Sequence, residues 1–156
     1  MEKVAIIMGS ISDREIMEKA ANILKEMNIS CEMKVLSAHR TPDLLFEYIS
    51  YLDKNDFKVI IAGAGGAAHL AGVIASRTLL PVIGVPIETK ALGGLDSLLS
   101  TVQMPGGIPV ATVGIGNAKN AGLLAAHILA IENSKIRERL KEYRKAMAQK
   151  IKEIKI

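Results

Sequence analysis

The sequence has one cysteine, no tryptophan and only five other aromatic residues among its 156 residues. The single cysteine, Cys31, excludes an internal disulfide and is typical of a protein from a reducing compartment. No apolar run approaches the roughly 18 residues that a membrane span requires. The start, Met1-Glu2-Lys3 followed by a short apolar stretch, is too abrupt for a signal peptide. We therefore expect a cytoplasmic protein that does not contact a membrane.

The net charge of +4 arises at the C-terminal end of the chain. From Lys135 onward there are nine Lys and Arg against three Glu, a local charge of +6, so the first 134 residues carry −2. Basic residues confined to one segment indicate a solvated helix face. Because few aromatic residues are available to stack on bases and no nucleic-acid-binding motif is present, we do not expect nucleic acid as a partner.

Five short apolar segments alternate along the chain with residues at helical spacing. The predicted strands cover residues 4–8, 31–36, 58–62, 82–85 and 110–113, the fourth of them closed by Pro86. Apolar strands separated by helices are typical of a parallel sheet covered on both faces. The right-handed crossover rule favours a flavodoxin-like, five-stranded sheet of order 2-1-3-4-5, in a single α/β domain over residues 1–156.

Local signals predict where the helices begin. Ser12, followed three residues later by Glu15, predicts a capping box. Thr41 followed by Pro42 predicts a helix with the threonine as N-cap and the proline as its first residue. Residues 91–109 contain two Gly-Gly pairs and are predicted to form a long connection, and connections of this length are usually functional.

The C-terminal segment has a narrow apolar stripe. From Ser134 onward, apolar residues follow at spacings of four, three, four, four and three: Ile136, Leu140, Tyr143, Met147, Ile151 and Ile154. This spacing is typical of one face of a long helix. Because a sheet that is already covered leaves little room for such a helix, we predict that residues 134–156 pack on a neighbouring subunit and serve oligomerisation. The alternative is packing on its own domain.

Three turns that follow the first three predicted strands carry polar or glycine-rich sequences. The candidate residues are Ser10, Ser12 and Asp13 in the first turn, Ser37, His39 and Arg40 in the second, and Gly63, Gly65, Gly66 and His69 in the third. The carboxyl ends of parallel strands meet at one edge, where ligands bind. Glycine amides, a helix N-terminus and Arg40 are suited to hold a phosphate. Asp13 would repel a phosphate and suits hydroxyls instead, which favours a phosphorylated sugar as substrate.

His39 is the candidate proton carrier, because imidazole is the side chain that titrates near neutral pH. In the alternative interpretation, the turn is an ordinary capped loop in which His39 and Arg40 are merely solvated. The three histidines show no metal-ligand spacing, so no metal site is expected. His127 lies in an Ala/Leu-rich segment and is expected in the core or at an interface.

Competing motifs are weak. The spacing Gly63-x-Gly65-x-x-Ala68 matches the dinucleotide-binding fingerprint, but it follows the third predicted strand and not the first. Neither the nucleophilic-serine elbow nor the ATP phosphate loop is present in the sequence. Covalent serine catalysis and ATP hydrolysis are therefore disfavoured, and a small pocket with one well-placed histidine suggests proton transfer.

Four blocks of sequence carry a resemblance to a known family. They are Gly-Ser-Ile-Ser-Asp at 9–13, Ser-Ala-His-Arg-Thr-Pro at 37–42, Gly-Ala-Gly-Gly-Ala-Ala-His-Leu at 63–70 and Gly-Leu-Asp-Ser-Leu-Leu-Ser-Thr-Val-Gln-Met-Pro at 94–105. Through these blocks, and over nearly its whole length, the sequence resembles the N5-carboxyaminoimidazole ribonucleotide mutase family of de novo purine biosynthesis. It departs from the family pattern at Ala71, where proline is usual, and at Arg14, where tryptophan is common.

The resemblance implies a three-layer α/β/α sandwich assembled as an octamer, with no metal or organic cofactor. It also implies a reaction in which the carboxylate on the exocyclic nitrogen of an aminoimidazole ribonucleotide moves to a ring carbon. By matching position, Ser10, Asp13 and Arg40 would bind the ribose phosphate, and His39 would be the general acid and base. The residues implied around the carbon chemistry are Ala38, the glycines of the 63–66 turn and His69. Leu70, next to His69, would be a further substrate-binding residue.

Three other functions stay open at this stage. An enzyme of the same fold could carboxylate aminoimidazole ribonucleotide with free CO2, although the block Gln103-Met104-Pro105 is more like the mutase branch. A flavodoxin-like module could bind flavin or another nucleotide without catalysis. A structural assembly protein could be organised by the basic terminal helix, and removal of His39 would then have no consequence.

Overall fold

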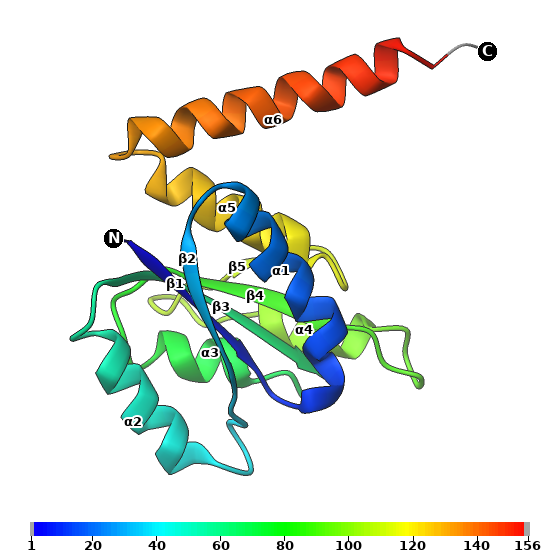
Figure 1. Ribbon diagram of the computed structural model, residues 1–156. Coiled ribbons are helices and arrows are strands. Elements are labelled where there is room, and N and C mark those ends of the chain that lie inside the picture. Colours follow the sequence, from blue (N-terminus) through cyan, green and yellow to red (C-terminus); the bar gives the residue numbers. More distant parts are fainter. Residues whose placement is uncertain (1, 155–156) are drawn as a thin grey trace.

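The computed structural model describes residues 2–154. Within them, five parallel strands form one sheet of order β2-β1-β3-β4-β5 (Figure 1). The strands are β1 Lys3–Met8, β2 Ser30–Val35, β3 Phe57–Gly65, β4 Val82–Ile87 and β5 Ala111–Thr112. The predicted α/β class and strand order are confirmed.

Two strand boundaries differ from the prediction in ways that affect the site. Strand β3 continues through the first two glycines of the predicted turn, so its carboxyl end lies at Gly65. Strand β4 runs through Pro86, although proline cannot donate to a sheet. It is tolerated because β5 pairs with β4 only as far as Gly84, and beyond that point the Pro86 carbonyl accepts from the Gly116 amide at 2.8 Å.

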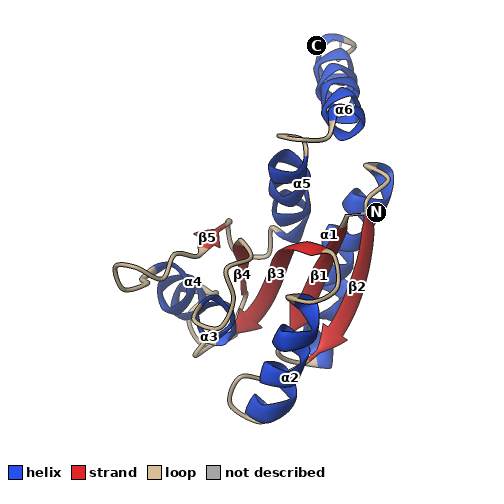
Figure 2. Ribbon diagram, turned by 90° about the vertical axis from the view of Figure 1, so that its left-hand side faces the viewer, coloured by secondary structure: helices blue, strands red, loops and turns tan. Residues whose placement is uncertain are grey.

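Helices cover both faces of the sheet, as Figure 2 shows. Helices α1 (Arg14–Glu26) and α5 (Ala118–Leu129) lie on one face, and α2 (Pro42–Leu52), α3 (Leu70–Ala75) and α4 (Leu95–Val102) lie on the other. Alternate residues of β1 serve the two cores, since Ile6 packs with α1 and α5 while Ile7 packs with α2 and α3. The result is the three-layer sandwich that the resemblance implied.

The predicted capping box at Ser12 is wrong. A single 3₁₀ turn, η1 (Ile11–Asp13), precedes α1, so α1 begins only at Arg14 and Ser12 is not its N-cap. The Ser10 hydroxyl caps η1 instead, accepting from the Ser12 amide at 3.3 Å and from the Ser12 hydroxyl at 2.9 Å. The predicted start of the next helix at Pro42 is confirmed, but the Thr41 hydroxyl does not cap it.

The segment predicted as one long connection, residues 91–109, contains helix α4. Its buried positions are Ser97 and Thr101, while Leu95, Leu99 and Val102 are exposed. A helix that packs through its polar face has the opposite of the usual hydrophobic pattern, which is why the pattern did not reveal it.

The last helix, α6 (Ser134–Lys152), lies beyond α5 and extends away from the sheet (Figure 1). Ile136 and Leu140 are buried against the α5 side of the core, so the first half of the stripe packs on its own chain. Met147 and Ile151 in the second half are 46% and 70% exposed. Among residues 2–154, no helix is both long and apolar enough to cross a membrane.

Candidate functional site

A cavity of about 370 Å³ lies at the carboxyl ends of β1, β2 and β3. Its lining residues are Gly9, Ser10, Ser12, Asp13, Ser37, His39, Arg40, Ala64 and Gly65. The cavity sits beside the β1–β3 pair, where the strand order reverses. This is the crevice in which open α/β sheets bind their ligands.

The turn after β2 is held closed by its own side chains. The Thr41 hydroxyl accepts from the Ser37 amide at 2.9 Å and can donate to the Ser37 carbonyl at 3.1 Å. The Ser37 hydroxyl in turn accepts from the Arg40 amide at 3.1 Å. These bonds leave His39 and Arg40 exposed at the tip of a fixed turn.

Arg40 links the second turn to the first. Its Nη2 donates to the Gly9 carbonyl at 2.8 Å, 31 residues away in sequence. The guanidinium therefore lies beside the hydroxyls of Ser10 and Ser12 in the shared cavity. A guanidinium with hydroxyl donors is a fitting arrangement for a phosphate group, to which arginine can bind through two parallel hydrogen bonds.

Asp13 is the carboxylate of the cavity and is only 8% exposed. Burial raises the pKa of its carboxyl, against the opposing effects of a Ser10 backbone bond, the Ser12 hydroxyl and the Arg40 charge. A carboxylate that has lost much of its water is suited to accept hydrogen bonds from ligand hydroxyls.

His39, in the turn after β2, is paired with His69, in the turn after β3. His39 Nε2 lies 2.9 Å from His69 Nδ1, and the rings meet edge to face with centroids 4.9 Å apart. One of these two nitrogens must carry the proton and the other must accept it. The pair therefore holds a proton between its two rings.

The structure brings most of the predicted site residues together. The predicted residues that line the cavity are Ser10, Ser12, Asp13, Ser37, His39, Arg40 and Gly65, and His69 joins them through its bond to His39. Gly9 and Ala64, which line the cavity too, were not predicted. Both are small residues at strand ends, and only the register of β1 against β3 could have placed them.

Besides His69, four predicted residues do not line the cavity. Gly63 is buried within β3, where a Cβ would come within 2.3 Å of Met17 Sδ, so this glycine allows α1 to pack closely. Leu70 is 2% exposed and belongs to the core between the sheet and helices α2 and α3, and Ala38 packs against that core. Gly66, with φ +71°, forms the turn after β3 and donates its amide to the Ser97 hydroxyl.

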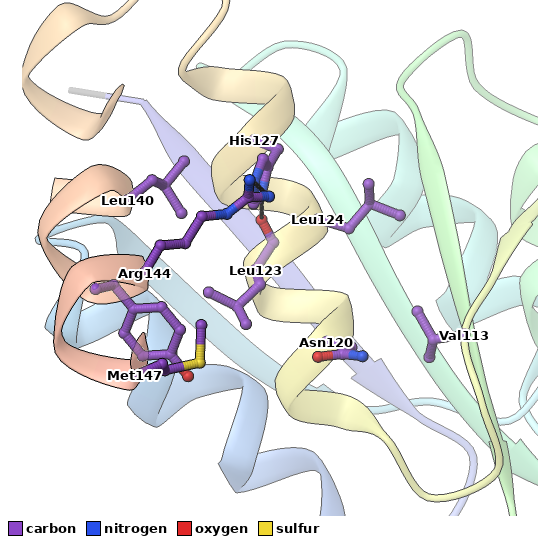
Figure 3. A pocket seen from close by; sticks show the side chains of 9 residues that line it. Val113, Asn120, Leu123, Leu124, His127, Leu140, Arg144 and Met147 are labelled. Atoms are coloured by element: carbon purple, nitrogen blue, oxygen red, sulfur yellow. Dashed lines mark hydrogen bonds between the residues drawn. The ribbon is translucent and has the colours of Figure 1, made fainter. Parts of the chain in front are cut away.

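A larger groove of about 520 Å³ lies elsewhere, between α5 and α6 (Figure 3). Its lining residues are Val113, Asn120, Leu123, Leu124, His127, Leu140, Tyr143, Arg144 and Met147. His127 is exposed rather than in the core; its Nδ1 lies 2.7 Å from the Leu123 carbonyl and its Nε2 lies 3.1 Å from Arg144 Nη2. Apart from the His127–Arg144 pair, Asn120 and Tyr143, its lining is apolar, and it has no carboxylate. We therefore assign the functional site to the smaller cavity, where an arginine, a carboxylate and several hydroxyls converge.

No group of three or more His, Cys, Asp or Glu within residues 2–154 is placed to hold a metal ion. The cavity at β1–β3 thus offers an arginine, hydroxyls, one carboxylate and a histidine pair. These groups are suited to an anionic, hydroxylated small molecule, and they lie at the switch point of a flavodoxin-like sheet.

Comparison with known proteins narrows this class. The model of the AIR carboxylase family matches residues 3–150, and the chain belongs to this family. Three relatives carry the name N5-carboxyaminoimidazole ribonucleotide mutase. The protein from Pyrococcus abyssi is 61% identical over 147 residues, which cover 94% of this chain and 84% of the relative. The Thermotoga maritima protein is 58% identical over 97% and 88% of the two chains, and the Escherichia coli protein 52% over 96% and 89%.

Solved structures agree with the fold. The crystal structure of Treponema denticola PurE superposes with a TM-score of 0.91 at 32% sequence identity, covering 98% of this chain and 96% of the other. The sandwich and its sheet order are therefore those of a solved relative.

Proposed function

We propose that this chain is an N5-carboxyaminoimidazole ribonucleotide mutase of purine biosynthesis. It would convert N5-carboxyaminoimidazole ribonucleotide to 4-carboxy-5-aminoimidazole ribonucleotide. The observation that carries the proposal is the juxtaposition, in one cavity, of His39 with the Arg40, Ser10 and Asp13 side chains. The names of the relatives support the same reaction.

The anion-binding end of the cavity would anchor the ribonucleotide. Arg40 and the hydroxyls of Ser10, Ser12 and Ser37 would bind the phosphate, and Asp13 would accept from the ribose hydroxyls. The Arg40 side chain is already hydrogen-bonded to the Gly9 carbonyl. Binding of the phosphate would therefore cost little further side-chain entropy. An anchored phosphate leaves the aminoimidazole ring to reach His39.

His39 would serve both halves of the reaction. In the first half its imidazolium gives a proton to the exocyclic nitrogen, the N–C bond of the carbamate breaks, and CO2 and aminoimidazole ribonucleotide result. In the second half the ring carbon bonds to the CO2 and its proton passes to the now neutral imidazole. The proton count returns to its start, so His39 is ready for the next turnover. With one ring nitrogen bonded to His69, the other is left to exchange with substrate.

The cavity wall would keep the CO2 next to the ring. Gly9, Ala64 and Gly65 contribute backbone and one methyl group but no polar side chain. A small and weakly polar wall does not hydrate CO2, and it holds the gas near the carbon that it must join.

The test of this proposal is turnover of N5-carboxyaminoimidazole ribonucleotide by the purified protein. We expect formation of the 4-carboxy product without added bicarbonate. The description of the family as AIR carboxylase keeps a second candidate in view, a carboxylase acting on aminoimidazole ribonucleotide and free CO2. Activity with aminoimidazole ribonucleotide that rises in proportion to bicarbonate, together with none toward the N5-carboxylated compound, would establish the carboxylase instead. Turnover of neither compound would refute both.

The enzyme is further proposed to act as a homo-oligomer, an octamer, in the cytoplasm. The exposed apolar residues toward the end of the chain support self-association, because Met147, Ile151 and Ile154 are 46%, 70% and 65% exposed. Met147 also lines the apolar groove between α5 and α6, so stripe and groove form one continuous apolar surface. A second copy of the chain would cover it.

Met147→Glu is therefore expected to shift the protein to smaller assemblies while the chain stays folded, since Met147 is exposed within the chain. Light scattering and circular dichroism measure the two effects. Ala146→Glu adds the same charge one residue away, on another face of α6, and should leave the assembly unchanged. An unaltered mass for Met147→Glu would contradict the proposed interface. Truncation at residue 133 is a poorer test, because it also removes the buried Ile136 and Leu140.

A further inference from the structure

Helix α4 is packed with its polar face inward. Ser97 is fully buried and Thr101 is 3% exposed, whereas Leu95 and Leu99 on the opposite face are 50% and 47% exposed. Burying hydroxyls costs free energy unless each finds a partner. What these hydroxyls bond to therefore indicates what the helix does.

The partners are the backbone groups of the turn after β3. The Ser97 hydroxyl accepts from the Gly66 amide at 2.9 Å and donates to the Ile87 carbonyl at 2.6 Å. It thereby joins the turn to the end of β4. Gly66 lies past the last residue of β3, where the sheet no longer provides a partner for its amide.

Ser100 makes a second set of bonds to the same turn. Its hydroxyl accepts from the Ala68 amide at 3.0 Å. Its single proton can go to the Gly66 carbonyl at 3.0 Å or to the Asp96 carbonyl, one helical turn back, at 2.7 Å. Thr101 adds a longer bond to the Ala68 carbonyl at 3.4 Å.

The position of α4 itself is fixed. Gly94, just before the helix, has φ +92°, and a Cβ there would come within 2.6 Å of the Ile115 side chain. The helix start is thus held by a conformation and a close contact that only glycine allows. The conformation of Gly94 thus fixes where α4 begins, and with it the positions of Ser97 and Ser100 along the helix.

The Gly66–Ala68 turn, which these serine hydroxyls hold in place, leads directly into His69, and the His69 ring is hydrogen-bonded to His39. We propose that Ser97 and Ser100 are positioning residues of the reaction, which act on His39 by fixing the Gly66–Ala68 turn and through it the His69 ring. The inference rests on the proposed function. Neither serine lines the cavity, so neither touches substrate. Loss of the hydrogen bonds from these serines to the turn should therefore affect proton transfer more than substrate binding.

The test compares Ser100→Ala with wild type. We expect kcat to fall about 10- to 100-fold, the effect of a small misplacement in a catalytic site, with KM changed less than about threefold. Ser100→Thr retains the hydroxyl and should recover most of the rate. Ser50→Ala is the matched control, since Ser50 also donates to the carbonyl four residues back, to Phe46 at 3.0 Å, but on α2 away from the cavity. Its kcat should equal that of wild type.

A double-mutant cycle separates positioning from general damage. If Ser100 acts through His69, then Ser100→Ala should cost little further rate in a His69→Asn background. An equal loss of kcat in both backgrounds, or an unchanged kcat for Ser100→Ala, would overturn the inference. Ser97→Ala, examined in the same cycle, provides the second variant should Ser100→Ala fail to fold.

A readout without substrate keeps this inference separable from the proposed function. The imidazole nitrogen and proton NMR signals of ligand-free protein report whether the His39 and His69 rings share a hydrogen bond. We expect this bond in wild type and Ser50→Ala, and its loss in Ser100→Ala. A bond that persists in Ser100→Ala would overturn the positioning role, whereas its loss in a protein without mutase turnover would uphold the role of Ser100 and refute only the proposed function.

Discussion

His39→Asn is expected to lower kcat about 10³-fold or more, a loss of about 4 kcal/mol in transition-state stabilisation. The asparagine amide can hydrogen-bond but cannot carry a proton from one half of the reaction to the other. Affinity for the ribonucleotide should change little, because Arg40, Ser10 and Asp13 stay in place. Stopped-assay turnover and calorimetric titration with the product measure the two quantities.

The control for this variant is His127→Gln, which replaces a histidine in the α5–α6 groove by a side chain that keeps a hydrogen-bond acceptor. Its kcat should match that of wild type. A His39→Asn protein with near-normal kcat would show that a group other than His39 serves as general acid and base. If His39→Asn binds the product tightly but has lost turnover, His39 acts in the proton transfers and not in holding the ribonucleotide.

Arg40→Met is expected to show the opposite pattern. Charge-assisted hydrogen bonds contribute about 1.5–3 kcal/mol, so KM for the ribonucleotide should rise roughly 10- to 100-fold. The Met side chain retains much of the apolar stem but cannot bond the Gly9 carbonyl or a phosphate. kcat at saturating substrate should fall less than KM rises, because His39 and His69 remain.

Initial rates over a wide substrate range give both constants for Arg40→Met. Arg77→Met is the matched control, since the Arg77 guanidinium lies over the Phe46 ring at 4.1 Å and not in the cavity. Its KM should be that of wild type. An unchanged KM for Arg40→Met would place the phosphate elsewhere in the site.

The sheet could be predicted from the sequence because its central strands are buried on both faces. Apart from Lys3, strands β1 and β4 consist of apolar residues, and the crossover rule leaves few orders for the strands. The exact ends of the strands could not be predicted in this way. Gly63 belongs to β3 because the strand continues past the point where glycine suggested a turn. The composition of a segment does not reveal how far its hydrogen bonds to the neighbouring strand continue.

The site was predictable as a set of turns, but not as a set of contacts. Strand order alone brings the turns that carry Asp13 and His39 to one crevice. The bond between His39 and His69 depends on the path of the turn after β3, and that path depends on hydroxyls of α4 about 30 residues further along the chain. Since α4 packs through serine and threonine, hydrophobic periodicity does not point to it.

The reversed polarity of α4 has a consequence for variation in this enzyme. Leu95, Leu99 and Val102 lie on the outside of the same eight-residue helix whose inner face braces the turn before His69. Changes at these surface positions that shift α4 would therefore also shift the Gly66–Ala68 turn to which its inner face is hydrogen-bonded. Surface redesign of α4, made for solubility or assembly, would therefore carry a cost in turnover.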